Sequence, residues 1–61
     1  MKYYIVQNEA QRQTTNFDII KVKETVEGKF LEGLKEDTKV VVEADSLMEA
    51  IIKFQKAIAN D

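Results

Sequence analysis

The side-chain types that most enzyme chemistry requires are scarce in this sequence. It contains no Cys and no His, so it offers no thiolate nucleophile, no Cys- or His-based metal site and no imidazole proton shuttle. Ser46 precedes Glu49 by three residues, a spacing that is typical of a helix N-cap rather than of a nucleophile. We therefore expect a protein that is not an enzyme and that uses neither a cofactor nor a metal.

Carboxylates are the remaining candidates for catalysis or cation binding. Glu24 falls on the inward parity of a predicted strand, where burial would suit a carboxylate to acid–base chemistry. The alternative, which we favour, is a carboxylate in water near the end of that strand. The pairs Glu36-Asp37 and Glu43…Asp45 offer oxygen ligands to a hard cation, but they lack the spacing of a calcium loop. We interpret them as solvated turn residues.

Lysines on a predicted strand face suggest nucleic-acid binding as an alternative function. The lysines concerned are Lys21, Lys23, Lys29 and Lys39. Tyr3 or Tyr4 could add a ring on which a base stacks. The chain, however, carries 11 acidic against 9 basic residues, whereas surfaces that bind nucleic acid have a positive excess. Nucleic acid is therefore the second choice of partner.

Three segments rich in β-branched or aromatic residues predict strands. They are residues 2–7, 17–26 and 38–44. The first is apolar at both parities, so we expect it to be central or covered on both faces. The second alternates, as a half-buried strand does. In the third, strict alternation assigns Val40 and Val42 to one face and Val41 to the other.

The segments between these strands are less clearly patterned. Residues 8–16 are polar and aperiodic, which predicts a loop. Glu27-Gly28 offers a two-residue turn, with residues 29–31 as the return strand. The alternative is a short helical turn over residues 29–35 that ends near Gly33. The sheet accordingly has either three or four strands.

A capping box and an amphipathic pattern predict a helix over residues 46–59. In the box, the Ser46 hydroxyl accepts from the backbone N–H of Glu49, whose side chain reaches back. The residues expected to face the sheet are Leu47, Ala50, Ile51, Phe54, Ala57 and Ile58. The expected fold is α+β, with residues 1–61 as a single domain. A three- to four-stranded antiparallel sheet carries one C-terminal helix on one face.

The predicted sheet carries more apolar side chains than one helix can cover. Each Val, Ile or Phe left in water forgoes roughly 1.5–3 kcal/mol of burial. We therefore expect the chain to bind another polypeptide, as a homodimer or with a partner protein. The alternative is that residues 8–16 and 30–34 cover the second face. The expected contact residues are Tyr3, Gln11, Arg12, Gln13, Phe17, Val41, Met48 and Ile52.

The sequence shows no sign of membrane insertion or secretion. Its longest apolar runs are far shorter than the roughly 18 residues of a membrane span. The N-terminus lacks the long apolar stretch and cleavage site of a signal peptide. Since the chain also lacks Cys, we expect a cytoplasmic protein that does not bind membranes.

The junction between the third strand and the helix resembles a pattern of very small phage and prophage proteins. It reads Val41-Val42-Glu43-Ala44-Asp45-Ser46-Leu47-Met48-Glu49-Ala50-Ile51. In such proteins a Val-rich strand ends in Ala-x-Ser-x-x-Glu-Ala and continues into a terminal helix. The resemblance implies an accessory protein that binds and blocks a bacterial enzyme, including enzymes of antiviral defence, in the cytoplasm of the host cell.

Overall fold

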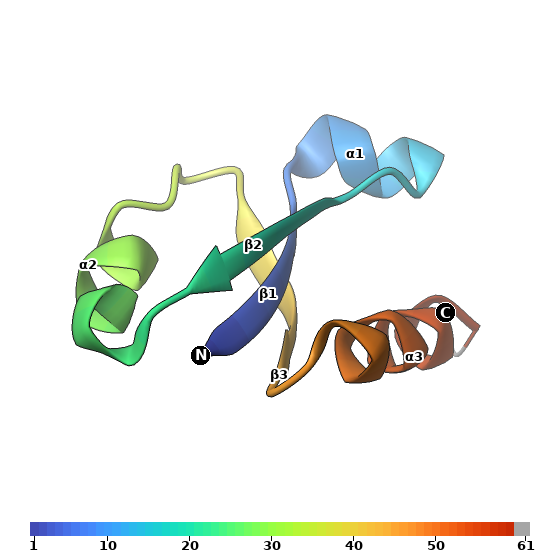
Figure 1. Ribbon diagram of the computed structural model, residues 1–61. Helices are drawn as coiled ribbons and strands as arrows, with labels where there is room; N and C mark the ends of the chain where they lie inside the picture. The colour runs from blue at the N-terminus through green and yellow to red at the C-terminus, as the bar shows by residue number, and fades with distance from the viewer. Residues whose placement is uncertain (60–61) are drawn as a thin grey trace.

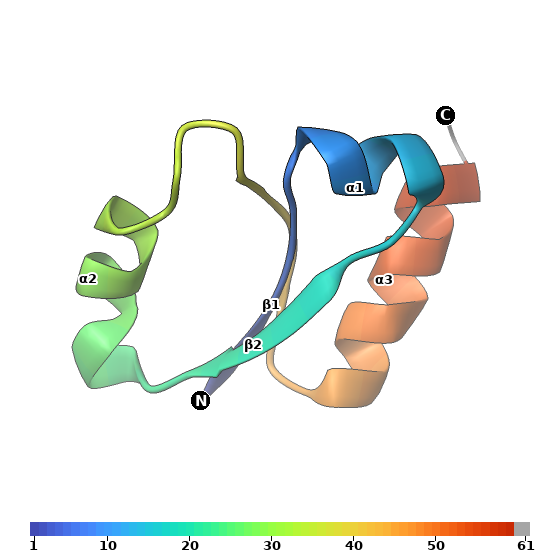
Figure 2. The ribbon, with the colours of Figure 1, turned by 90° about the horizontal axis from the view of Figure 1, so that it is seen from above.

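A computed structural model describes residues 1–59 of the chain. Within these residues, a three-stranded antiparallel sheet has the strand order β2-β1-β3. Its strands are β1 (Lys2–Gln7), β2 (Asp18–Val22) and β3 (Lys39–Ala44). Helix α3 (Leu47–Ala59) packs on one face, and helix α2 (Glu27–Glu32) lies on the opposite side (Figure 1 and Figure 2). The expected α+β architecture is confirmed.

β1 is the central strand, and its two faces belong to two different hydrophobic cores. Ile5 is fully buried on the α3 side, whereas Tyr4 and Val6 are buried on the α2 side. The α3-side core consists of Ile5, Val42, Ala44, Ala50 and Phe54, and the α2-side core of Tyr4, Val6 and Val22. The two-sided apolar pattern of residues 2–7 therefore predicts both the position and the burial of this strand correctly.

A β-bulge in β3 decides which of its valines face α3. Ile5 pairs with Val42, but the next residue, Val6, pairs with Val40, so Val41 is an extra residue in the ladder. Val41 packs with Val42 against the α3-side core, and Val40 joins the α2-side core. The strict alternation predicted for residues 38–44 is wrong for this reason.

Residues 8–16, which the sequence predicts to be a loop, contain helix α1 (Glu9–Thr14). Asn8 Oδ1 accepts from the N–H of Gln11 (2.8 Å), and Gln11 Oε1 accepts from the N–H of Asn8 (2.9 Å), which forms a capping box. The helix ends at Thr15, whose left-handed conformation (φ 61°) stops it. None of the residues Glu9–Thr14 is buried, so the sequence has no apolar periodicity that would predict this helix.

β2 ends at Val22, earlier than the sequence predicts. A single 3₁₀ turn, η1 (Glu24–Val26), follows and leads directly into α2. The prediction of a two-residue turn at Gly28 followed by a return strand is therefore wrong. The alternative of a short helical turn near Gly33 is confirmed, because the N–H of Gly33 closes α2 on the carbonyl of Lys29 (3.0 Å).

Residues 30–34 cover part of the second face of the sheet. Phe30 and Leu34 pack against the α2-side core, and the Phe30 ring lies against that of Tyr4 with the centroids 5.1 Å apart. The expectation that a single helix leaves this face bare is therefore wrong. The apolar surface that remains exposed lies mainly on the other side, around α3.

α3 begins after Ser46 with one half of the predicted capping box. Ser46 Oγ accepts from the N–H of Glu49 (3.2 Å), but the Glu49 carboxylate pairs with Lys53 one turn later (3.1 Å). The predicted helix over residues 46–59 is confirmed. No helix within residues 1–59 is long and apolar enough to cross a membrane.

Candidate interaction surface

The apolar side of α3 is wider than the strip of sheet on which the helix lies. Ala50 and Phe54 are buried against the sheet, and Ala57 is half-buried. The other members of the predicted core-facing stripe remain exposed to 38–46%: Leu47, Ile51 and Ile58. At about 100° per residue, these three lie on one flank of the buried line. The prediction that the whole stripe faces the sheet is wrong for them.

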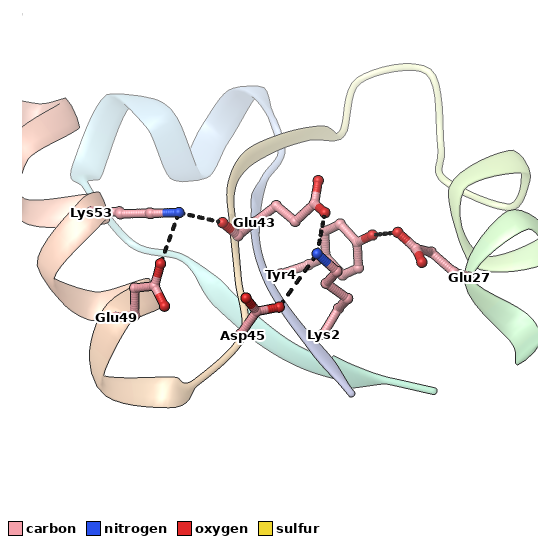
Figure 3. Close-up of polar contacts among 7 residues, drawn as sticks. All are labelled: Lys2, Tyr4, Glu27, Glu43, Asp45, Glu49 and Lys53. Atoms are coloured by element: carbon pink, nitrogen blue, oxygen red, sulfur yellow. Dashed lines mark hydrogen bonds and ion pairs between the residues drawn. The ribbon is translucent and has the colours of Figure 1, made fainter. Parts of the chain in front are cut away.

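Lys53 shows which flank of α3 lies over which strand. Its Nζ donates to the backbone carbonyl of Glu43 in β3 (3.1 Å) and pairs with Glu49, as Figure 3 shows. Lys53 lies on the opposite side of the buried line from Ile51. Because the polar flank covers β3, the apolar flank is directed towards β2.

β2 and the residue before it contribute apolar side chains to the same region. Ile19 pairs with Ile5 and therefore shares its face of the sheet, but 38% of Ile19 stays exposed. Phe17 packs its ring against Phe54, with the centroids 4.4 Å apart. We define the α3–β2 surface by five residues: Phe17, Ile19, Leu47, Ile51 and Ile58.

Met48 and Ile52 continue the apolar residues onto the side of α3 that faces away from the sheet. Met48 is 73% exposed, the largest fraction among the large apolar residues described, and Ile52 is 46% exposed. They are four residues apart and so lie next to each other on the helix. We call this pair the outer ridge. Large exposed apolar patches on small proteins mark interaction sites.

The other predicted contact residues are dispersed or partly buried. Tyr3 and Val41 pack against the α3-side core and are half-buried. The side chain of Gln11 serves the capping box of α1 and donates to Asp18 (3.1 Å). Arg12 and Gln13 are exposed on α1. Of the eight predicted residues, only Phe17, Met48 and Ile52 therefore belong to the apolar region around α3.

Sequence reasoning missed four members of this region. They are Ile19, Leu47, Ile51 and Ile58, of which the last three were assigned to the core. The available signal was the breadth of the apolar arc, which includes Met48 and Ile52 as well as the predicted stripe. One face of a small sheet cannot cover such an arc.

The four lysines of the nucleic-acid alternative do not form one row. Lys21 lies on β2 with its Nζ 5.8 Å from the ring centroid of Tyr3. Lys23 follows the end of β2, and Lys29 belongs to α2 on the other side of the sheet. Lys39 begins β3 at the opposite edge. The predicted row required β2 to continue to residue 26, and it does not.

Of the two acidic pairs considered as cation ligands, Glu36 and Asp37 are exposed, whereas Glu43 and Asp45 hold an ammonium group. Lys2 Nζ pairs with Glu43 (3.0 Å) and Asp45 (3.4 Å), as Figure 3 shows. The hydrogen bonds to these two carboxylates raise the pKa of Lys2 above its ordinary range. Glu24 is exposed at the start of η1, as the favoured interpretation expects. Residues 1–59 contain no cluster of three metal-ligating side chains and enclose no pocket.

Tyr4 makes the polar contact that joins α2 to the sheet. Its Oη donates to the carboxylate of Glu27 at the start of α2 (Figure 3). This hydrogen bond, together with burial, raises the pKa of Tyr4 to about 12. The phenol therefore stays protonated and serves as a structural donor.

No protein-family model, curated protein or solved structure matches the chain. The fold places the chain in the class of small α+β proteins, with a three-stranded antiparallel sheet in its described part. Its most distinctive surface is apolar and lies on α3 and β2. The function is accordingly argued from that surface.

Proposed function

We propose that this chain is a non-enzymatic protein–protein interaction module that works as a homodimer. The observation that carries the proposal is the exposed apolar region of α3 and β2. Its residues are Phe17, Ile19, Leu47, Met48, Ile51, Ile52 and Ile58, which are 37–73% exposed. Monomeric proteins rarely leave large contiguous apolar areas exposed, and the largest such patches are often functional.

The outer ridge is the part of this region that we assign to a protein partner. Met48 is flexible and polarizable, so it adapts to the shape of the surface that it meets. Ile52 beside it adds a rigid branched side chain. The resemblance of residues 41–51 to phage and prophage proteins supports a bacterial enzyme as the partner. Binding would block that enzyme by covering part of its surface. Enzymes of antiviral defence are among the bacterial enzymes that this proposal includes.

Affinity capture from bacterial lysate with matched variants tests the proposal. The test variant is Ile52→Glu, and the control is Leu31→Glu, an equally exposed apolar position on α2. We expect the wild type and the control to retain the same protein from the lysate. The Ile52→Glu variant should bind that purified partner at least about tenfold more weakly, because the change affects a residue in an interface hot spot. A partner that binds all three chains equally would contradict the assignment of the outer ridge.

A mobility-shift titration with single-stranded DNA and RNA tests the alternative function. We expect no shift at low salt, because the lysines are distributed over different elements and the net charge is −2. A salt-dependent shift, combined with a capture experiment that retains no protein, would favour nucleic-acid binding and overturn the proposal.

A further inference from the structure

We infer that the second copy of the chain pairs with the outer edge of β2, so that two protomers share one continuous antiparallel sheet. The inference rests on the homodimer of the proposed function and specifies its interface. It follows from a difference between the two edges of the sheet, from the side chains along β2 and from the area that the chain exposes.

The edge formed by β3 is protected against strand pairing. The bulge at Val41 interrupts its ladder, and the ammonium group of Lys53 donates a hydrogen bond to the backbone carbonyl of Glu43 (3.1 Å). Lys39 places a charge at the start of the same strand. Bulges and lysines are the features by which natural proteins discourage edge-to-edge association.

The edge formed by β2 has no such protection. Its five residues pair with β1 in regular register, and its outer side pairs with no strand of residues 1–59. The ammonium group of Lys21 lies 5.8 Å from the Tyr3 ring on β1, and Asp18 accepts from Gln11 (3.1 Å). The two charged side chains of β2 are therefore directed towards their own chain. Ile19 and Ile20 supply apolar side chains on the two faces.

A two-fold axis at Ile20 gives the register with the greatest overlap. It pairs Ile20 with Ile20 of the partner subunit, Ile19 with Lys21 of the partner subunit and Asp18 with Val22 of the partner subunit. Axes at Asp18 or Lys21 would place like charges directly opposite each other, which destabilises an antiparallel pair. The sequence of β2 therefore favours the full five-residue overlap.

This arrangement also joins the apolar surfaces of the two copies. An axis perpendicular to the sheet keeps both α3 helices on the same face, so each α3–β2 surface meets its counterpart across the axis. The chain exposes 4526 Å², against about 4,000 Å² expected for a monomer of 7.0 kDa, and it measures 32 × 26 × 14 Å. The exposed area in excess of that expectation is a substantial part of the roughly 800 Å² that each partner buries in a stable interface. The outer ridge remains outside the interface and accessible.

Cysteine cross-linking identifies the edge that pairs. Because the chain has no Cys, a single introduced Cys reports one position. An axis at Ile20 brings the two Cα atoms to about 4.5–5.5 Å, within the range of a disulfide. We expect Ile20→Cys to form a linked dimer under mild oxidation, and Lys39→Cys on the β3 edge to remain monomeric. Linkage through Lys39→Cys alone would overturn the inference.

Light scattering during chromatography separates the failure of this interface from the failure of the homodimer. We expect the wild-type mass to rise towards twice 7.0 kDa with concentration, and Ile19→Lys to weaken the dimer at least tenfold. Val26→Lys, an exposed position on η1, is the control that should dimerise normally. A dimer that Ile19→Lys leaves intact rejects the β2 edge and preserves the homodimer. A wild type that is monomeric at all concentrations rejects both the β2-edge interface and the homodimer. The binding of a partner protein to the outer ridge is tested separately by the capture experiment.

Discussion

Tyr4 is the residue at which the polar and apolar contacts of the fold meet. Its ring is fully buried in the α2-side core against Phe30, while its hydroxyl reaches Glu27. A buried tyrosine needs a partner for its hydroxyl, because an unpaired polar group in an apolar environment is destabilising. Glu27 meets this requirement from the first turn of α2, so Tyr4 joins the helix to the central strand through both a polar and an apolar contact.

We expect the stability of the protein to fall with rising pH through the titration of Tyr4. Its pKa is raised from 10.0 to about 12, so the folded state holds the phenolic proton more tightly than the unfolded state. The contribution of the protonated Tyr4 to the free energy of unfolding is complete below pH 10 and is lost as the pH rises towards 12. Urea titrations across this interval should show a steeper loss for the wild type than for Tyr4→Phe. Tyr3→Phe is the control, and equal slopes for the wild type and Tyr4→Phe would refute the assignment.

At the scale of elements, α1 shows that a helix can begin without an apolar face. Its start is fixed by the reciprocal hydrogen bonds of Asn8 and Gln11. We expect Asn8→Ala to lower the free energy of unfolding by about 1 kcal/mol, the usual cost of losing an N-cap. Urea denaturation measures the change. Asn16→Ala is the matched control, since among the described residues only the backbone carbonyl of Asn16 forms a hydrogen bond. An equal cost for both variants would contradict the role of the cap.

The elements that could be predicted are those with a strong local signal. Residues 2–7 and 39–44 are rich in β-branched side chains, and residues 47–59 repeat apolar residues at helical spacing. α1 and α2 have six residues each and no buried residue of their own, so periodicity could not reveal them. The end of β2 was missed because Val26 has the same parity as Ile20 and Val22, although the chain has already turned into η1 there.

The interaction surface could be predicted only in part, for a reason that lies in packing. The sequence identifies which residues of α3 are apolar, and so it indicates Met48 and Ile52. It does not say how much of the circumference the sheet covers. That depends on the close approach permitted by the small, fully buried Ala50 and on the position of Lys53 over β3. The bulge at Val41 is likewise a property of the paired strands, and alternation along one strand does not reveal it.

At the scale of the whole molecule, small size makes each core residue important. A 61-residue domain has an expected stability of about 3–9 kcal/mol. Phe54 is buried against both the sheet and Phe17, and truncating a buried Phe costs about 3–5 kcal/mol. We therefore expect Phe54→Ala to be largely unfolded in dilute solution by far-ultraviolet circular dichroism.

Ile58→Ala provides the control for this experiment on the same helix. Ile58 is 41% exposed in the single chain, so its truncation should cost about 1 kcal/mol and leave the protein folded. Measurement at concentrations where protomers are separate keeps any contribution from self-association out of the comparison. Unfolding of both variants to the same extent would show that the core is not concentrated at Phe54.

The strand order also bears on how the protein is made. β1 and β2 precede residue 30, yet the other neighbour of β1, β3, follows only after α2, and α3 comes directly after it. A chain that lacks β3 therefore leaves one side of β1 without a paired strand. A premature stop codon before β3 would release a two-stranded fragment with an uncovered apolar strand, a natural substrate for chaperones and proteases rather than a shorter working protein.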